Sequence, residues 1–112
     1  MKKAARDANE GAIVKALRNR GCLVQPLMQG GGVPDLLVCG PDGTLTLLEV
    51  KDPAKRPSQR RLTPDQVEWH RTWLAFGARL SVVEYATDAM LACGLSTDND
   101  ETHICVDKAV NP

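Results

Sequence analysis

The sequence GGGVPDLLVCGPDGTLTLLEVK, residues 30–51, decides the fold of this chain. Two apolar runs flank a Gly-Pro-Asp-Gly turn at 40–43, in which proline presets the first turn position and Gly43 is free to adopt a left-handed conformation. The pattern predicts a β-hairpin with strands over 33–39 and 44–51, joined by a type I turn with Gly43 as a bulge. We expect this hairpin to form the centre of a sheet.

The register of this hairpin brings charged side chains together. If Gly40 pairs with Thr44, counting outward places Asp35 opposite Glu49 on the neighbouring strand. Lys51 lies two residues beyond Glu49 and therefore on the same face of the sheet. A slip of one residue would separate these side chains, so the prediction depends on the turn.

Opposed carboxylates on adjacent strands repel, since their Cβ atoms are about 5 Å apart. A divalent cation between Asp35 and Glu49 would offset that repulsion. Carboxylate oxygens, the backbone carbonyl of Val50 and several waters suit Mg²⁺ or Mn²⁺, whereas the sequence offers no Cys/His set for zinc. Lys51 would orient or deprotonate a water, or stabilise a phosphoryl transition state. The alternative is a surface charge cluster without a metal.

The remaining elements follow from hydrophobic periodicity and from glycine or proline at their ends. They are a helix over 4–20, a strand over 22–28, a helix from Thr63 to Gly77, a strand over 78–85, a helix over 87–93 and a short strand over 103–106. The strand that follows the Thr63 helix is expected to be parallel to the second hairpin strand, because a helix connects them. The predicted fold class is therefore α/β, with an αβββαβ core and a mixed central sheet.

The first helix carries an acidic residue on its apolar side. Glu10 extends the stripe formed by Ile13, Val14 and Leu17, so its carboxylate is aimed inward and needs a partner there. In the alternative interpretation Glu10 lies near the helix start, partly exposed, and pairs with Arg6 four residues earlier.

The second helix opens with a capping-box pattern, in which Thr63 is the N-cap, Pro64 occupies the first helical position and Gln66 the third. Apolar residues are expected to cover its buried side. They are Val67, Trp69, Trp73, Leu74 and Phe76.

Net charge does not point to an anionic partner, because fourteen Lys and Arg residues balance fourteen Asp and Glu residues. Their distribution does, since basic residues cluster in the loop after the hairpin and near the N-terminus. The loop residues are Lys55, Arg56, Arg60 and Arg61, and the N-terminal ones are Lys2, Lys3 and Arg6. We interpret them as phosphate contacts, and the alternative is a solvated loop.

The 112 residues suffice for a single domain spanning 1–112. The four cysteines form no Cys-x-x-Cys pair, which is typical of reduced thiols in a cytosol. No apolar run reaches membrane-spanning length, and no leader pattern precedes the first helix. We therefore expect a soluble cytoplasmic protein.

Asp35, thirteen intervening residues and Glu49-Val50-Lys51 resemble the signature of PD-(D/E)xK nucleases, and further details resemble their VRR-NUC family. These details are Glu10, GVPDLLV at 32–38, LEVK at 48–51, and LTPDQ at 62–66 followed by Trp69. The resemblance lies within the core at about 4–94, whereas residues 95–112 form an extension without a recognisable motif.

The resemblance implies a restriction-endonuclease-like core and a role for each matching residue. Asp35 and Glu49 would bind the metal, and Glu10 would complete the acidic cluster, contacting the metal through a water. Lys51 would act on the attacking water. Gln66 would support the site from the second helix, while capping remains a competing role for it.

The resemblance also implies an Mg²⁺- or Mn²⁺-dependent endonuclease acting on DNA, without an organic cofactor or a membrane. Stand-alone members resemble junction resolvases, so the specific expectation is a homodimer that cuts four-way (Holliday) junctions in bacterial or phage DNA repair. The alternatives are a flap or branched-DNA nuclease, a general DNA nickase, a catalytically idle nucleic-acid-binding module, and a partner-binding protein in which the acidic cluster is incidental.

Overall fold

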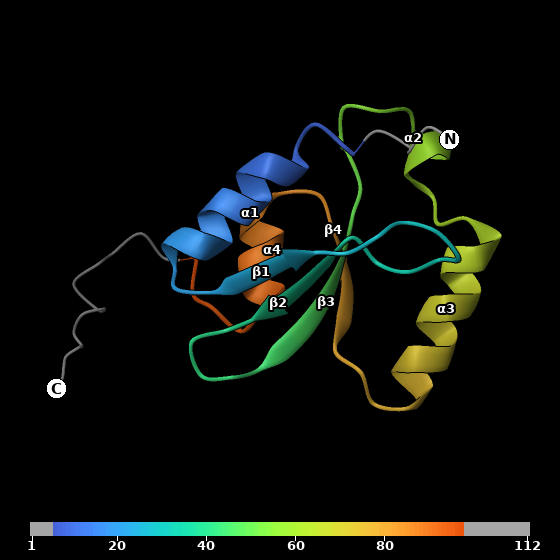
Figure 1. The fold of residues 1–112 in the computed structure, drawn as a ribbon. Coiled ribbons are helices and arrows are strands. Elements are labelled where there is room, and N and C mark those ends of the chain that lie inside the picture. The colour runs from blue at the N-terminus through green and yellow to red at the C-terminus, as the bar shows by residue number, and fades with distance from the viewer. Residues whose placement is uncertain (1–5, 98–112) are drawn as a thin grey trace, which may run out of the picture.

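The computed structural model describes residues 6–97 and has an α/β fold built on one four-stranded sheet (Figure 1). The elements in chain order are α1 (Glu10–Asn19), β1 (Leu23–Pro26), β2 (Leu36–Cys39), β3 (Leu45–Val50), α2 (Pro57–Arg60), α3 (Pro64–Ala75), β4 (Leu80–Val83) and α4 (Ala86–Ala92). The strand order is β1-β2-β3-β4; the first three strands are antiparallel and β4 is parallel to β3. The predicted fold class and mixed sheet are confirmed.

The β2–β3 hairpin has the predicted register. Leu36 lies opposite Leu48, so the next residues along the two chains are Asp35 and Glu49. Gly43 has a φ of 86°, which a residue with a Cβ atom rarely adopts, and it therefore serves as the bulge of the turn. The turn and the ladder together bring the two carboxylates to the same end of the hairpin.

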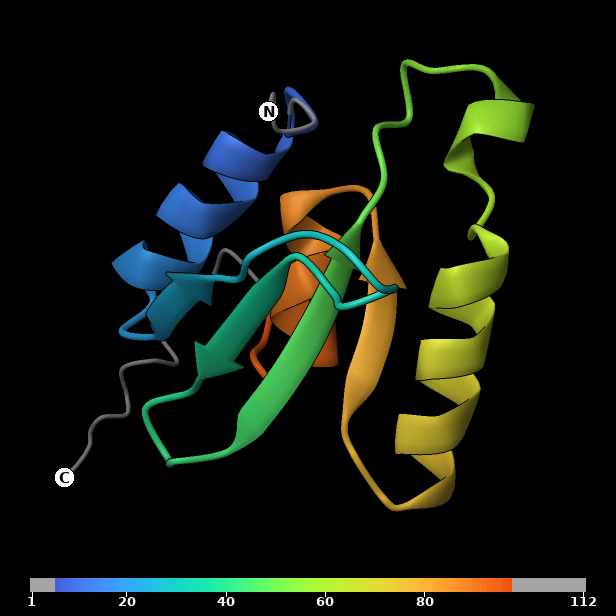
Figure 2. The same ribbon diagram turned by 45° about the vertical axis from the view of Figure 1, so that its right-hand side comes forward.

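Helices cover the two faces of the sheet unequally (Figures 1 and 2). Helices α1 and α4 lie together on one face and enclose the apolar core, whereas α3 stands beside β4 on the other face. Because side chains alternate along a strand, Leu36 and Leu48 point into the core while Asp35 and Glu49 lie on the α3 face. The largest fully buried apolar side chains of the core are Ile13, Leu17, Leu36, Leu48, Val38 and Val83.

Helix α1 begins at Glu10, six residues later than the predicted start at residue 4. The preceding residue explains the difference. The Asn9 side-chain amide donates to the Lys51 carbonyl at 2.9 Å and to the Glu84 carbonyl at 2.7 Å. These two hydrogen bonds anchor the chain to the ends of β3 and β4, so that the helix starts from a fixed point above the sheet.

The loop after β3 contains one unpredicted helical turn, α2, with proline at its first position. The short strand predicted over 103–106 lies outside the described residues. No helix within residues 6–97 is long and apolar enough to cross a membrane. Cys22, Cys39 and Cys93 carry free thiols, and Cys105 lies outside that range.

The predicted buried face of α3 is wrong for four of its five residues, and Trp69 alone among them is half-buried. The buried residue of this helix is His70, which is 7% exposed. Four residues predicted to be buried are exposed: Val67, Trp73, Leu74 and Phe76. At 3.6 residues per turn, the side of α3 nearest the sheet begins with Gln66 and His70. These two residues are polar because they contact Glu49 at the acidic end of the hairpin, which hydrophobic periodicity does not detect.

Candidate active site

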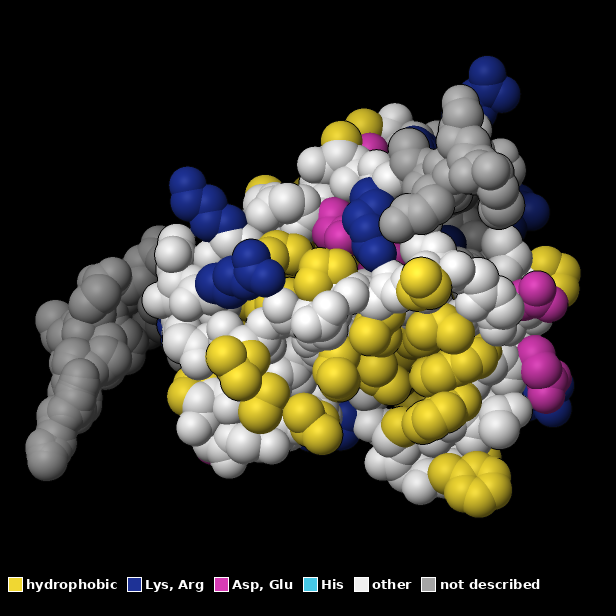
Figure 3. Space-filling view, viewed as in Figure 1, with side chains coloured by type: hydrophobic (Ala, Val, Ile, Leu, Met, Phe, Trp, Pro, Cys, Tyr) yellow, Lys and Arg dark blue, Asp and Glu magenta, His cyan; other side chains and the backbone are white. Residues whose placement is uncertain are grey.

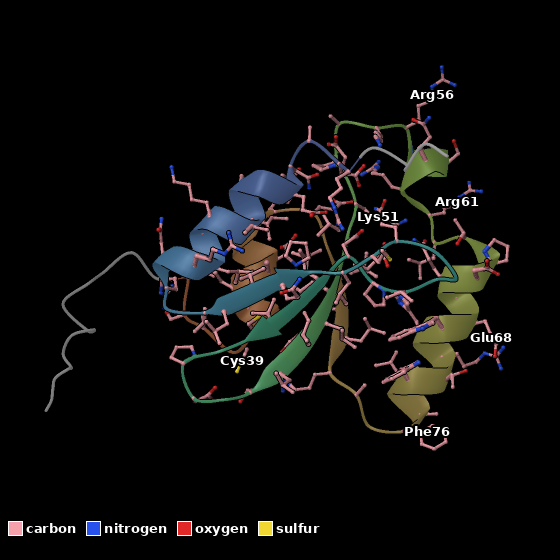
Figure 4. The ribbon with its side chains drawn as sticks, viewed as in Figure 1. Cys39, Lys51, Arg56, Arg61, Glu68 and Phe76 are labelled. Atoms are coloured by element: carbon pink, nitrogen blue, oxygen red, sulfur yellow. The ribbon has the colours of Figure 1, made fainter. Side chains whose placement is uncertain are left out.

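The candidate site is a cleft of about 160 Å³ where the ends of the hairpin meet the start of α3. Figure 4 shows Lys51 at this junction, below the α2 turn. Of the predicted metal-binding and catalytic residues, five line the cleft: Asp35, Glu49, Val50, Lys51 and Gln66. Segments well separated in the sequence, the hairpin and α3, thus contribute to one small polar space.

Asp35 is held rigidly at the start of β2. Its Oδ2 accepts a hydrogen bond from the Val50 backbone amide at 2.7 Å, and its Oδ1 accepts one from the Gln29 side chain at 3.2 Å. The Asp35 side chain is buried. A buried carboxylate with a backbone donor on one oxygen has a fixed orientation, as a metal ligand requires.

Glu49 is more deeply buried than Asp35, at 2% exposure, and is less well supplied with donors. Its Oε2 accepts from the Gln66 side-chain amide at 3.0 Å, whereas its Oε1 has no hydrogen-bond partner. Burial, followed by the charge of Asp35 and a hydrogen bond with it, raises the pKa of Glu49 to about 8. The Lys51 ammonium, 4.0 Å from Oε2, lowers that pKa only in part.

Lys51 and Gln66 form the opposite wall. The Lys51 Nζ donates to the Gln66 Oε1 at 3.0 Å, and the Lys51 side chain is buried. The same Gln66 oxygen accepts from the Thr63 backbone amide at 2.9 Å, while the Gln66 backbone amide donates to the Thr63 hydroxyl oxygen at 3.2 Å. The predicted capping box is therefore present, and Gln66 at once caps α3 and contacts Glu49 and Lys51.

Glu10 is not among the residues that line the cleft, but Arg6 connects it to Asp35. Its carboxylate is buried, as predicted, and both oxygens accept from the Arg6 guanidinium at 3.2 and 3.0 Å. Arg6 also lies 3.8 Å from the Asp35 Oδ1, so it stands between the two acids. Burial raises the pKa of Glu10, and Arg6 opposes that rise. The two interpretations of Glu10 made from the sequence, an inward carboxylate and an ion pair with Arg6, therefore both hold.

The polar atoms of the cleft fit a small divalent cation. Burial and the neighbouring Asp35 carboxylate both raise the pKa of Glu49, and Glu49 Oε1 has an unused acceptor position. Within residues 6–97, no cluster of three or more His, Cys, Asp or Glu side chains offers a complete protein cage for an ion. Mg²⁺ needs no such cage, because it commonly keeps several waters and binds one or two carboxylates.

The four predicted DNA-binding residues of the loop divide into two kinds. Lys55 pairs with Asp7 at 2.7 Å, and Arg60 pairs with Glu84 at 3.4 Å, so acids already neutralise both. Arg56 and Arg61 form no ion pair within the described chain, and they extend outward around α2 in Figure 4. Lys2 and Lys3, predicted to add to this set, lie outside the described residues.

Sequence reasoning missed His70, Asn9 and Gln29. The Nε2 of His70 lies 3.5 Å from Glu49 Oε1. The Gln29 side chain donates to Asp35, and the Asn9 side chain donates to the Lys51 backbone carbonyl. For His70 a signal existed: it follows Gln66 by four residues, which places it on the same helix face one turn later. For Asn9 and Gln29 only the folded chain reveals the contact.

Gly32 sets the distance between the glycine-rich loop and α3. A Cβ atom at this position would overlap the backbone carbonyl of Asp65, and the φ of 85° is unfavourable for any side chain.

We predict that Gly32→Ala shifts the start of α3, displaces Gln66 and lowers the expected DNA-cleavage activity. Gly31→Ala is the matched control, because its φ of 62° imposes similar strain in open space. It should cost about 1–2 kcal/mol of stability, measured by denaturant unfolding, without the loss of activity. Equal activity of the two variants would contradict this role for Gly32.

The high pKa of Glu49 predicts a pH dependence of stability. Because folding raises this pKa from 4.5 to about 8, the folded protein retains a proton that the unfolded chain releases within that range. The free energy of unfolding without metal should therefore fall as pH rises from 4.5 to 8. Thermal unfolding in chelator measures this slope. It should flatten in Glu49→Gln and with added Mg²⁺; an unchanged slope in Glu49→Gln would contradict the assignment.

The comparisons with known proteins agree with this geometry. No protein-family model matches the sequence, and no curated protein does. Among solved structures, one described as "VRR_NUC domain" is similar to this chain, with 32% sequence identity and a TM-score of 0.54. The match covers 72% of this chain and 89% of the other. The resemblance found in the motifs therefore extends to the three-dimensional structure, and this chain belongs to the VRR-NUC family of nuclease domains.

Proposed function

We propose that this protein is a metal-dependent endonuclease that hydrolyses phosphodiester bonds in structured DNA. One observation carries the proposal: in a chain of a nuclease family, Asp35, Glu49, Lys51 and Gln66 line the same cleft. A surface charge cluster would leave these side chains solvated, whereas here Asp35, Glu49 and Lys51 are all buried. Burying charged groups costs free energy, and buried charged groups that line a cleft are typical of functional sites.

Asp35 and Glu49 would hold Mg²⁺ or Mn²⁺, with the Val50 carbonyl as a third protein ligand and Glu10 contributing through a water. When bound, such an ion activates water and offsets negative charge on the phosphate. The Val50 amide and the Gln66 amide fix one oxygen of each carboxylate, at 2.7 and 3.0 Å. The protein thereby orients both ligands before the substrate arrives.

Lys51 is the residue placed to act on the reacting groups. One of its N–H groups is engaged by Gln66 at 3.0 Å, which leaves two donors for other groups in the cleft that Lys51 lines. There its ammonium would hold the attacking water or a phosphate oxygen. As the new P–O bond forms and the bond to the leaving oxygen breaks, charge grows on the phosphate oxygens, and a fixed ammonium stabilises it.

Arg56 and Arg61 are the loop residues best suited to hold flanking phosphates, because they form no ion pair among the described residues. We predict that the double variant Arg56→Ala/Arg61→Ala binds DNA more weakly. The slope of log affinity against log salt should fall by about 2, measured in chelator to prevent cleavage. Arg71→Ala is the control, because Arg71 pairs with Glu68 on the outer side of α3. An unchanged slope in the double variant would show that the loop does not contact DNA.

We propose further that two copies associate, as the cutting of paired strands in a four-way junction requires. The support is an open apolar surface on the α3 face of the sheet (Figure 3). Two hollows of about 530 and 560 Å³ adjoin there and share Leu37 and Leu45. Trp69 and Trp73 stack at the wall of the larger hollow, with ring centroids 4.4 Å apart. Exposed apolar surface of this kind is typical of protein interfaces.

The experiment is a cleavage panel of labelled duplex, flap, splayed and four-way substrates, with Mn²⁺ or with chelator, on protein whose mass is measured in solution. We expect cleavage only with metal, fastest on the four-way substrate, by a dimer. A flap preference would favour the branched-DNA alternative, and uniform nicking would favour a general nickase. Binding without cleavage would favour the idle module. Cleavage in chelator would overturn the metal-dependent proposal, and an active monomer would overturn the dimer.

A further inference from the structure

Two buried polar atoms, one on β3 and one on α3, lie close together without a hydrogen bond. They are His70 Nε2 and Glu49 Oε1, which lie 3.5 Å apart. Both side chains are buried, at 8% and 3% exposure. An unpaired buried polar atom costs about 1–3 kcal/mol, so two of them in contact distance call for an explanation.

The geometry of α3 supplies one. Gln66 and His70 are four residues apart, so their side chains lie on the same helix face, one turn from each other. Gln66 donates to Glu49 Oε2 at 3.0 Å, and His70 is the nearest group to the other oxygen of the same carboxylate. A single helix thus places one side-chain nitrogen near each oxygen of Glu49.

The helix that makes these contacts is itself fixed at its start. The Thr63–Gln66 capping box closes its first turn, and the glycine-rich loop packs against Asp65 so closely that Gly32 has no room for a Cβ atom. Helix α3 therefore cannot slide freely along the sheet. It is a suitable element from which to hold a carboxylate in one orientation.

We propose that His70 is a positioning residue, which donates its Nε2–H to Glu49 Oε1 and, together with Gln66, orients the carboxylate toward the divalent cation. The proposal rests on the proposed function, since it takes Glu49 as a metal ligand. Each carboxylate oxygen has two acceptor positions, so a donor from α3 occupies one and leaves the other for the ion. A separation of 3.5 Å shortens to a normal hydrogen bond with a small rotation of either side chain, and such contacts commonly tighten when the site is filled.

The test compares His70→Phe, which keeps a flat ring without a donor, with His70→Gln, which returns an N–H group. Mn²⁺ affinity is measured calorimetrically without DNA, and the cleavage rate separately at saturating Mn²⁺. Loss of a group that orients a metal ligand typically costs 10–100-fold in affinity, and His70→Phe should lose about that much. His70→Gln should recover a substantial part of the loss. Circular dichroism and thermal unfolding in chelator check the fold, and His70→Leu replaces the phenylalanine variant if that fails to fold.

A purely space-filling role predicts a different result, in which the apolar variants bind Mn²⁺ as tightly as the wild type and unfold at the same or a higher temperature. That result would overturn the inference. Failure of the glutamine variant to bind better than the phenylalanine variant would also overturn it. The failure of the proposed function can be distinguished from the failure of this inference. If the wild-type protein binds no Mn²⁺, both the proposed function and the role of His70 are overturned. If the wild type binds Mn²⁺ and cleaves DNA, and the apolar variants do so equally well, only the role of His70 is overturned.

Discussion

Asp35→Asn is expected to lower the rate of DNA cleavage by at least about 10²–10³-fold and to weaken Mn²⁺ binding in the absence of DNA. Asparagine has the same shape, and its side-chain oxygen can still accept the 2.7 Å bond from the Val50 amide. The fold should therefore persist. What is lost is the Asp35 negative charge, and with it one of the two carboxylates proposed to hold the metal.

A matched control exists on the same hairpin. Asp42 is an exposed turn residue whose carboxylate accepts from the Thr44 amide at 3.0 Å, far from the cleft. Asp42→Asn makes the same chemical change and should leave cleavage unaltered. Steady-state cleavage assays and calorimetric Mn²⁺ titrations on both variants provide the comparison. If Asp35→Asn cut DNA at the wild-type rate, Asp35 would not be a metal ligand.

Lys51→Ala is expected to lower the cleavage rate by about 10²–10⁴-fold while Mn²⁺ binding persists. The substitution removes the ammonium beside the carboxylates but leaves the Gln66 oxygen its bond from the Thr63 amide, so α3 keeps its start. Single-turnover assays at saturating Mn²⁺ measure the rate, and calorimetry measures metal binding.

The control for this variant is Lys15→Ala, at an exposed position of α1, which should behave as the wild type. The outcome against the assignment is a Lys51→Ala protein that cleaves normally, or one that loses metal binding together with activity. The first would remove Lys51 from the chemistry. The second would make it a structural support for the carboxylates and not a participant in the reaction.

The hairpin and its acidic end could be predicted because the decisive interactions are local. The Gly-Pro-Asp-Gly turn fixes the register, and the register alone brings Asp35 in line with Glu49. The same holds for the start of α3, where Thr63 and Gln66 satisfy one another within four residues. In both places a few adjacent residues carry enough information to determine the geometry.

The buried face of α3 could not be predicted, because it depends on contacts between distant segments. Hydrophobic periodicity assumes that the inward side is the apolar one, whereas this helix turns Gln66 and His70 toward the acidic end of β3. The pairing of Lys55 with Asp7 is likewise non-local, since 48 residues separate them. The sequence indicated a continuous basic loop, and the fold neutralises half of it.

Glu10 shows how two interpretations of one residue can both hold. Its helical position predicted an inward carboxylate, and its spacing from Arg6 predicted an ion pair. In the folded chain Arg6 pairs with the buried Glu10 carboxylate and also lies 3.8 Å from Asp35. Helix α1 starts at Glu10, directly after Asn9, which is anchored to the ends of β3 and β4.

The most direct test of the central claim is the rate of cleavage of a four-way DNA substrate as a function of Mn²⁺ concentration, for the wild type and for Glu49→Gln. We predict no cleavage by the wild type in chelator, a rate that rises and saturates with Mn²⁺, and no comparable rise for Glu49→Gln at any concentration. Cleavage that is independent of Mn²⁺, or an equal rise in the variant, would contradict the account of this cleft as a metal-dependent nuclease site.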